Sequence, residues 1–418
     1  MSKTLMIKAM VLGAVACVFS ATGFAADVQN GHGQGIADST TEVNDAKHEA
    51  VRSNWMDRTD IVVGVGMKDS KETHSQHHYV GESSMRHDDL NTVTSKNSKS
   101  TEINKLYIET LQPITHYDEN AKSVVFVQGR IGRSGEKISS YKLDSYLEPA
   151  RPAGTFITHD KQTDTKESLG MNANIGIGYR RLSKGEHAYV GVNAFYDHVF
   201  KGGYKRVSGG VEYVAGLNEF HANLYRNLGT EDRKYIGLHG RSVVLGDPAG
   251  LYPYGMDPDQ SLYNYGVAAY ENHWMLSEKV AASGFDVGYS RTFKNARWAR
   301  VYADYYNWRG RESVRVGYYK LNKRDAIKGF NVGAEFHITP HLTLDAGYKT
   351  ASHHLSGPYA TLKYTIGTSK FAWRGGKHSE SVITTARSKM LDKVHRSDMV
   401  VQETVENIYE QQFVDVGL

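Results

Sequence analysis

Between Ile61 and Ile366 the chain repeats one pattern, in which apolar and polar positions alternate. The stretch 330–338 shows it clearly: one set of alternating positions holds Phe330, Val332, Ala334, Phe336 and Ile338, and the other holds Asn331, Gly333, Glu335 and His337. A period of two residues is typical of a β-strand, because successive side chains point to opposite faces. The polar face carries full charges beside glycines.

Segments of this kind predict an all-β fold, an antiparallel transmembrane β-barrel of about twelve strands. The segments are 61–67, 103–111, 123–131, 168–181, 187–198, 204–214, 217–227, 280–292, 298–308, 329–338, 342–350 and 359–367. They run for about ten residues, the length that a tilted strand needs to cross a bilayer. An even number suits a single-chain bacterial barrel. A soluble sandwich also alternates, so it stays open as an alternative.

Two further features favour the membrane barrel over the sandwich. Aromatic residues near segment ends are expected to form interface girdles: Tyr179, Tyr289, Tyr305, Trp308 and Tyr348. The charged face is expected to line the lumen, where opposite charges can pair in water. Seven residues are predicted to face it: Arg206, Glu212, Arg300, Asp304, Glu335, Asp345 and Lys363.

The connections between the segments alternate in length. Four of the six odd-numbered connections are long (69–100, 132–167, 228–279 and 309–328), whereas four of the five even-numbered ones have five residues or fewer. Outer loops of bacterial barrels are long and periplasmic turns are short. The first strand is therefore predicted to run outward, and the chain to enter and leave the barrel on the periplasmic side.

The N-terminus has the features of a secretory signal peptide over residues 1–26. Lys3 and Lys8 precede and flank the apolar run 9–20, and Ala25 and Ala26 supply small residues for cleavage. Cys17 is the single cysteine and lies in this run, so no disulfide is expected after cleavage. A lipoprotein acylated at Cys17 is the alternative. Residues 27–58 are polar without periodicity, which predicts a mostly disordered periplasmic segment with room for a short helix at 44–56.

Composition narrows the class of protein. The mean hydropathy of −0.51, with no later run of the roughly 20 apolar residues that a spanning helix needs, excludes a helical membrane protein. There are 50 Lys and Arg residues against 46 Asp and Glu, a formal net charge of +4. This balance, without a Lys- or Arg-rich block, argues against nucleic acid as a partner.

Little in the sequence points to catalysis or to a cofactor. His74, His77 and His78, with His87 beyond them, are one candidate metal cluster, but histidines of surface loops are more often only solvated, and no acidic residue has the spacing of a structural zinc site. The glycines lack a phosphate-loop pattern and are expected to allow close approach and curvature within strands. We expect no metal site and no cofactor.

Enzymes exist on outer-membrane barrels, so a lipase or a protease is the rival class. A lipase needs Ser and His on the lipid-facing side, and Ser208, His221 and His337 are predicted to face the lumen. A protease needs acid and base groups that meet, whereas Asp197 and His198 are neighbours in one strand and face opposite ways. We therefore expect no enzymatic activity.

Several runs together resemble a known family. They are Phe126–Arg130, Asn174–Arg180, Gly191–Asp197, Tyr204–Tyr213, Arg300–Tyr306, Leu342–Tyr348 and the stretch Lys377–Val394 after the last strand. These runs resemble the barrel domain of the intimin/invasin family, the inverse autotransporters, and the resemblance covers about residues 100–400. It implies a Gram-negative outer-membrane barrel at 59–367, with outer-membrane lipid, periplasmic chaperones and the barrel-assembly machinery as partners. It also implies a segment, 368–418, that threads back through the lumen.

In that family the exported part acts in cell adhesion and virulence through a host-cell or bacterial surface receptor. Here the 51 residues after the barrel are fewer than the about 100 of an immunoglobulin-like domain, and no peptidoglycan-binding module is recognisable before the barrel. Residues 383–394 are predicted to be helical. The outer loops 69–100, 132–167 and 228–279 are the expected contact surfaces for a partner.

A simple diffusion pore is the alternative function, because the charged lumen would allow it. The segment after the barrel is expected to occlude that lumen. Its cations Lys377, Arg387, Lys389 and Lys393 are predicted to pair with the luminal carboxylates of Asp304, Glu335 and Asp345.

Overall fold

The computed structural model describes residues 54–80, 88–118, 120–150, 155–229, 232–244, 266–310, 314–316, 319–321, 326–352, 356–367 and 386–416. The predicted signal peptide with Cys17, the polar segment up to residue 53 and Lys377 lie outside these ranges. The described chain begins with a short 3-10 helix, η1 (Trp55–Arg58), directly before the first strand.

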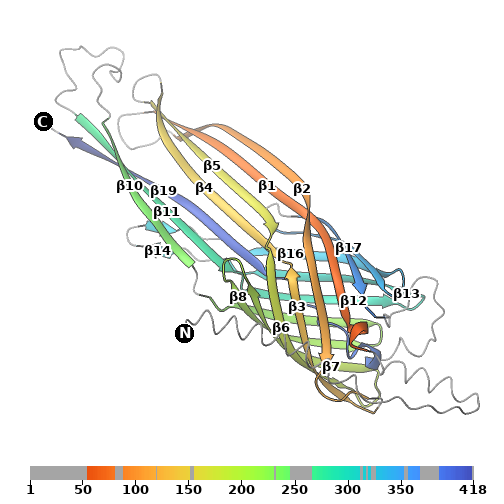
Figure 1. Ribbon diagram of the computed structural model, residues 1–418. Helices are drawn as coiled ribbons and strands as arrows, with labels where there is room; N and C mark the ends of the chain where they lie inside the picture. Colours follow the sequence, from red (N-terminus) through yellow and green to blue (C-terminus); the bar gives the residue numbers. More distant parts are fainter. Residues whose placement is uncertain are drawn as a thin grey trace, which may run out of the picture.

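Within these ranges, twelve strands form the closed barrel that the sequence predicts (Figure 1). They are β1 (Thr59–Val80), β2 (Asp88–Pro113), β3 (Ser123–Arg133), β6 (Met171–Leu182), β7 (Ala188–Val199), β8 (Lys205–Ala215), β9 (Asn218–Asn227), β12 (Gly284–Phe293), β13 (Ala296–Trp308), β16 (Ile327–His337), β17 (Leu342–Lys349) and β18 (Gly357–Thr365). Each is antiparallel to the next. The last closes onto the first, with Ile61 opposite Tyr364.

The alternating sequence becomes two unlike surfaces. On β7, Val190 and Val192 are 56% and 53% exposed and point outward, whereas Asn193 and Asp197 are 8% and 1% exposed and point inward. An apolar exterior around a charged interior inverts the arrangement of a soluble protein, and it is the arrangement of a membrane barrel. Among the described residues, no helix is long and apolar enough to span a bilayer.

Outward-facing aromatic rings gather at both ends of the barrel wall. Near the end with the short turns, the ring of Phe220 lies 6.4 Å from that of Tyr213 and 4.8 Å from that of Tyr289. At the opposite end, the ring of Tyr305 lies 6.1 Å from Phe285 and 5.2 Å from Phe330. Such rings are positioned as the interface girdles of membrane barrels are.

Trp308 does not belong to these girdles, contrary to our sequence-based prediction. It is 2% exposed and packs inside the barrel against Tyr225 and Tyr306. The reason is its position in β13: Arg300, Tyr306 and Trp308 are separated by even numbers of residues and therefore share the inward face.

Glycines on the inner face make room for large luminal side chains. A Cβ atom at Gly178 would lie 2.2 Å from the ring of Phe126 on the neighbouring strand, and one at Gly176 would meet the ring of Phe195 in the same way. Small and large residues thus face each other across strands, and the lumen is filled with side chains.

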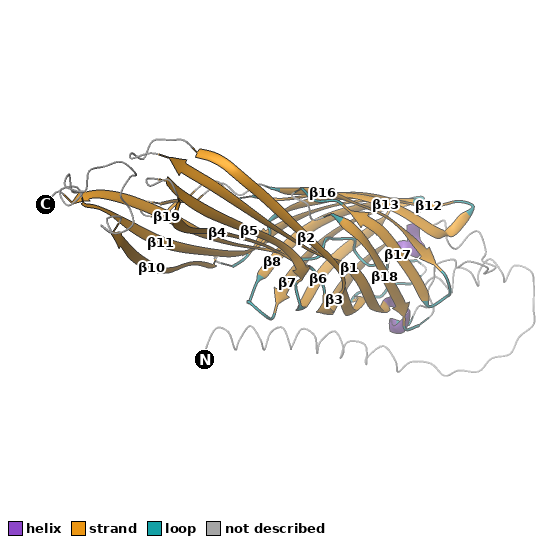
Figure 2. Ribbon diagram, turned by 90° about the horizontal axis from the view of Figure 1, so that it is seen from above, coloured by secondary structure: helices purple, strands orange, loops and turns teal. Residues whose placement is uncertain are grey.

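Beyond one end of the barrel the chain builds a further sheet, which extends away from the barrel mouth (Figure 2). Its strands lie in the order β2, β1, β5 (Thr155–Ser168), β4 (Glu136–Ala150), β19 (Val400–Val416), β11 (Gly266–Ala281) and β10 (Asp232–Val244). All these pairs are antiparallel except β19 with β4, which is parallel. β1 connects the two parts: its first residues pair with β18, and Asp69–Val80 pair with β5.

The sequence-based prediction treated most of this sheet as loops. The connection 69–100 consists largely of the extended ends of β1 and β2, and 132–167 and 228–279 contain the hairpins β4–β5 and β10–β11. A short hairpin, β14 (Val314–Val316) with β15 (Tyr319–Leu321), lies in 309–328. These strands lie beyond the barrel wall and need no apolar face for lipid, so their sequences lack the alternation that reveals the barrel strands.

The predicted helix over 383–394 is a second correction. In its described part, only Ala386–Lys389 is helical, as the 3-10 turn η3, and residues 390–399 have no regular secondary structure before β19 begins. Met390 and Asp392 still donate to the carbonyls of Arg387 and Lys389, but from Val394 on the backbone is bonded by side chains of the barrel wall, as described below.

The assignment of the outer face predicts a charge effect. Val332 is 52% exposed on the lipid-facing side of β16, so Val332→Arg should destabilise the barrel by roughly 2–4 kcal/mol, as a charge near the bilayer midplane does. The measurement is the unfolding midpoint in urea, read from the heat-modifiable gel mobility of the folded barrel. Val332→Leu is the matched control and should behave as wild type; equal midpoints for the Arg and Leu variants would contradict the assigned face.

Candidate functional site

The lumen is occupied by a segment of the chain itself, residues 386–399, which we call the luminal segment. At the end with the short turns, Arg387 bonds to Glu186 in the turn between β6 and β7. At the end with the extra sheet, the carbonyl of Met399 accepts a hydrogen bond of 3.0 Å from the backbone N–H of Glu136, where β4 begins. The luminal segment therefore runs through the whole barrel, and β19 continues it beyond the mouth.

Near the end with the short turns, the lumen contains an apolar cluster. Four residues of the luminal segment, Ala386, Met390, Leu391 and Val394, pack into one buried cluster with the wall. The wall contributes Leu111, Tyr117, Val124, Phe126, Leu182, Tyr189, Phe195 and Val214. Full burial of such a side chain stabilises by about 1.5–3 kcal/mol. This cluster accordingly helps to hold the segment in place, beside the guanidinium of Arg180, which lies 4.6 Å from the centre of the Phe126 ring.

Arg387 anchors the start of the luminal segment. Its guanidinium donates two hydrogen bonds to the Glu186 carboxylate, at 3.0 and 2.7 Å, and one of 2.8 Å to the carbonyl of Ala121. Two parallel bonds to a carboxylate give geometric specificity. Glu186 is the one non-glycine residue with a positive φ, 58°, among those described, and this backbone conformation in a tight turn is compatible with a functional constraint at that position.

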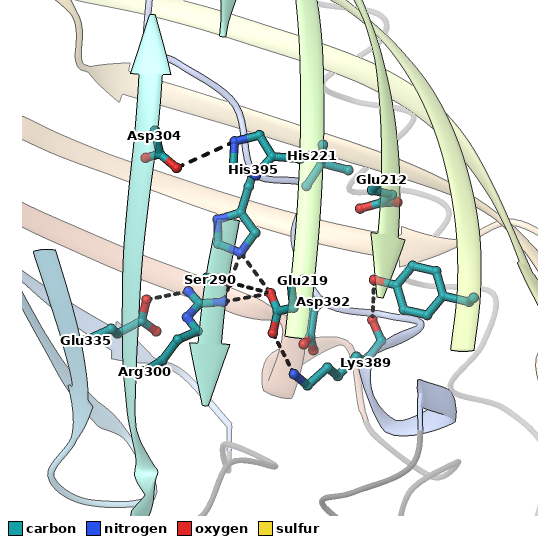
Figure 3. Close-up of polar contacts among 12 residues, drawn as sticks. Glu212, Glu219, His221, Ser290, Arg300, Asp304, Glu335, Lys389, Asp392 and His395 are labelled. Carbon is teal, nitrogen blue, oxygen red and sulfur yellow. Dashed lines mark hydrogen bonds and ion pairs between the residues drawn. The ribbon is translucent and has the colours of Figure 1, made fainter. Parts of the chain in front are cut away.

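Charges from the wall and from the luminal segment meet in the middle of the lumen (Figure 3). Glu219 lies 2.6 Å from the Nζ of Lys389 in the luminal segment and 3.2 Å from the guanidinium of Arg300 in the wall. Arg300 also bonds to Glu335 at 2.6 Å, and its Nη1 lies 2.9 Å from the Nε2 of His395. All five side chains share one network, so the segment is part of the charge balance of the barrel.

Next to this network two histidine rings are stacked. The ring of His395 in the luminal segment lies 5.8 Å from that of His221 on β9. The Nε2 of His221 is 3.7 Å from the Asp304 carboxylate and 3.9 Å from that of Asp286. Within the described residues no group of side chains has the arrangement of a metal site.

Towards the mouth, Asp197 binds two arginines from different parts of the chain. Arg206 on β8 donates to it at 2.8 Å, and Arg396 of the luminal segment donates at 2.7 and 2.6 Å. Asp197 and Arg206 are 1% and 0% exposed. Two residues after Arg396, Asp398 of the segment binds Arg130 at 2.7 Å. Each sign of charge is thus supplied by both the wall and the segment.

The wall also binds the backbone of the luminal segment. Three wall side chains donate hydrogen bonds to backbone carbonyls of the segment. Arg180 donates to Met390 and Asp392 (2.9 and 2.6 Å), Asn223 to His395 (3.0 Å), and Arg206 to Ser397 and Asp398 (3.0 and 3.3 Å). Acceptors reach the N–H groups of Val394 (Gln128, 2.9 Å) and Ser397 (the Tyr225 hydroxyl, 2.8 Å). Buried backbone groups need partners, and here side chains take the place of a helix. Residues 390–399 are therefore non-helical.

All seven residues predicted to line the lumen have interactions within it. Arg206, Arg300 and Glu335 lie in the networks above, and Glu212 binds Arg180 at 2.5 and 3.0 Å. Asp304 accepts from Asn331 (3.1 Å), Asp345 from the Tyr302 hydroxyl (2.6 Å), and Lys363 lies 3.5 Å from Glu335. Ser208 and His337 also face inward, both buried.

The pairing of the tail cations differs from the prediction. Arg387 binds Glu186, Lys389 binds Glu219 and Lys393 binds Asp60. The predicted acceptors Asp304, Glu335 and Asp345 are already held by side chains of the wall. Sequence reasoning missed Arg180, Glu219 and Asp60, although their inward position in alternating strands was a usable sign; the partners depend on how far the segment has advanced along the lumen, which strand periodicity does not encode.

The candidate histidine cluster is only partly described. His74 bonds to Glu72 of the same strand at 2.8 Å. The side chains of His77 and His78, and the whole of His87, lie outside the described residues.

A closed antiparallel barrel with an apolar exterior, a charged lumen and its own tail threaded from end to end defines an outer-membrane β-barrel of the exporting type. The chain belongs to the inverse autotransporter family: the family model described as "Inverse autotransporter, beta-domain" matches residues 145–398, more than half of the chain. The match ends at Asp398, the residue before the segment leaves the lumen.

No curated protein matches the sequence. Among solved structures, the chain is similar to one described as "Unveiling the Mechanism Behind the in-meso Crystallization of Membrane Proteins", with 14% identity, 83% of this chain and 100% of that chain covered, and a TM-score of 0.41. The translocator domain of autotransporter NalP from Neisseria meningitidis is 10% identical (78% and 95% covered, TM-score 0.22). The β domain of the Bordetella autotransporter BrkA is 8% identical (72% and 99%, TM-score 0.21).

The Asp197 network predicts an order of destabilisation. Asp197→Ala leaves Arg206 and Arg396 buried without their carboxylate. It should lower the free energy of unfolding by roughly 3–5 kcal/mol, as does the breaking of a buried ion pair. Arg396→Ala should cost less, because Asp197 keeps Arg206. The urea unfolding midpoint measures both, with Arg226→Ala at an exposed position of β9 as the control. If Arg396→Ala is as damaging as Asp197→Ala, the wall pair does not contribute as described.

Proposed function

We propose that this protein is an intimin/invasin-like outer-membrane anchor that exports its own C-terminal segment and presents it at the cell surface. The predicted signal peptide delivers the chain to the periplasm, where chaperones and the barrel-assembly machinery receive it. The observation that carries the proposal is the luminal segment, which enters the barrel beside the short turns and leaves it at the mouth that bears β4, β5, β10 and β11.

The direction of this path follows from the lengths of the connections. The end at which Arg387 is bound carries the short turns, such as 183–187 and 216–217, and short turns lie on the periplasmic side of bacterial barrels. The opposite end carries the long hairpins and hence faces the outside. β19, which follows the mouth, is then extracellular.

The contacts of the luminal segment support a segment that is held permanently in the lumen, and not one that slides freely through it. The segment is held by an apolar cluster at the bottom, by ion pairs with Glu219 and Asp197 in the middle and upper lumen, and by wall side chains that bind its backbone. A simple diffusion pore requires an open lumen, and this occupancy argues against that alternative. The proposed role is mechanical: whatever follows residue 399 is tied to the membrane.

We further propose that the extracellular sheet serves contact with another surface, a host cell or another bacterium. The support is its position: the hairpins that come from the predicted outer loops 132–167 and 228–279, with the extended ends of β1 and β2, project away from the mouth (Figure 2). This proposal gives no role to catalysis. If the sheet serves such contact, deletion of the gene should reduce adherence and aggregation of the cells.

The export proposal predicts the location of the C-terminus. An epitope tag placed after Leu418 should be detected by antibody on intact cells, at the same level as a tag in the outer connection 245–265. The control is the same probing after the outer membrane is permeabilised, which should add little for either tag. A C-terminal tag that is visible only after permeabilisation, in cells whose outer-connection tag is visible from outside, would contradict export.

A further inference from the structure

The strand that follows the luminal segment lies between two outer hairpins. β19 pairs with β4 in parallel from Val400, opposite Glu136, to Glu406, opposite Lys142. On its other side it pairs with β11 antiparallel, from Val401 opposite Ala281. In the sheet order β5, β4, β19, β11, β10, it is β19 that joins the hairpin β4–β5 to the hairpin β10–β11.

Without β19, both hairpins would present an unpaired edge. An unpaired strand edge is a row of N–H and C=O groups that binds another extended chain through its backbone. Over residues 401–406 the inserted strand is paired on both sides at once, which is the arrangement of a central strand. Its side chains here are buried as those of a central strand are: Val401, Gln402 and Glu403 are 0%, 3% and 4% exposed.

Side chains add a register to this backbone pairing. Val401 packs with Leu169, Val199 and Ala281 at the mouth, and Val400 packs with Trp308 and Tyr225 beneath it. A strand moved by one residue would exchange these two faces. The apolar residues at the mouth therefore specify which residue of the strand lies there.

Glu403 adds a charge requirement from both hairpins. Lys137 of β4 lies 2.6 Å from its carboxylate, and Lys279 of β11, its cross-strand partner, also bonds to it. Burial alone raises the pKa of Glu403, but the hydrogen bonds from the two lysines outweigh it and hold the pKa below its ordinary value. The paired carboxylate links the two hairpins through one residue.

We propose that the hairpins β4–β5 and β10–β11 form a strand-acceptor site for an extended polypeptide, which captures the chain as it emerges and retains it outside. The site accepts a strand parallel to β4 and antiparallel to β11, with apolar residues at the positions of Val401 and Val405 and a carboxylate between them. Return of the captured strand into the lumen requires that these bonds break, so capture opposes it. The inference deepens the proposed function and rests on it.

Cysteine pairs in the full-length chain test the register of this site. Cys17 is the only cysteine of the sequence, and Cys17→Ser in all variants leaves a clean background. Val405→Cys is combined with Ser277→Cys, its partner on β11, or with Tyr141→Cys, its partner on β4. The matched control is Val405→Cys with Glu271→Cys, which is six residues out of register on β11, about 20 Å away. Disulfide formation is read from gel mobility with and without reductant, on cells that also carry the C-terminal tag.

We expect a disulfide in both in-register pairs and none in the offset pair, on cells whose tag is visible from outside. A visible tag with no disulfide in either in-register pair, or with equal yields in all three, overturns the acceptor site and leaves the export proposal standing. A tag that is hidden in intact cells removes both.

Charge reversal tests capture itself. Glu403→Lys places a third cation between Lys137 and Lys279. The yield of the disulfide between Val405→Cys and Ser277→Cys should then fall to a small fraction of its value in the chain that keeps Glu403. Lys279→Glu in the same chain should restore most of it, because the cross-strand pair is re-formed with opposite orientation. No loss in Glu403→Lys, or a loss that Lys279→Glu leaves unchanged, contradicts the role of this carboxylate.

Discussion

Inside a bilayer each backbone N–H and C=O must find its partner within the protein, and the rest of this structure depends on that constraint. Twelve strands satisfy it only as a closed ring, which β18 completes by pairing with β1. Closure separates two environments that the chain must serve with alternate residues of the same strand. The outer face becomes apolar, and the inner face is free to carry the charges that a soluble protein would place on its surface.

Those inner charges bind a segment of the same chain. Arginines and carboxylates in a narrow, side-chain-filled lumen are costly to bury unless they are paired. The luminal segment adds partners to those that the wall provides: Lys389 for Glu219, Arg396 for Asp197 and Asp398 for Arg130. Wall side chains also bond to its backbone, so an extended chain is accommodated where a helix would have satisfied itself. Barrel and segment are thus one electrostatic unit, and the segment ties the sheet beyond the mouth to the barrel.

The barrel could be predicted from the sequence because lipid imposes a rule on every second residue. Phe330, Val332 and Ala334 satisfy it, and all twelve predicted barrel strands exist. The strands outside the membrane obey no such rule: β4 and β5 contain runs such as Asp160–Ser168 with no apolar face, so they could not be distinguished from loops. The prediction that Trp308 lies in an interface girdle is wrong because it rested on residue type, although the spacing of Trp308 from Arg300 indicated the lumen.

The position of the luminal segment could be predicted from the sequence less well than the strands of the barrel wall. None of the predicted pairs is present among the described residues: Lys389 and Lys393 bind Glu219 and Asp60 of the wall, and Arg387 binds Glu186 in a turn. The individual partners follow from how far the segment has moved along the barrel axis. That distance is set by Arg387 at the lower turn and by Met399 at the mouth, contacts between residues some 200 and 260 positions apart in the sequence, which local pattern cannot reveal.

The most direct test of the threaded lumen is a short thiol crosslink between wall and segment in intact cells. Gln128→Cys and Val394→Cys lie where the side chain of one meets the backbone of the other at 2.9 Å, and a short bis-maleimide should join them. Gln128→Cys with Val414→Cys, which lies on β19 beyond the barrel mouth and opposite Ala268 of β11, should give no product. The account predicts a crosslink only in the first pair; no product in the first pair, or equal product in both, would contradict it.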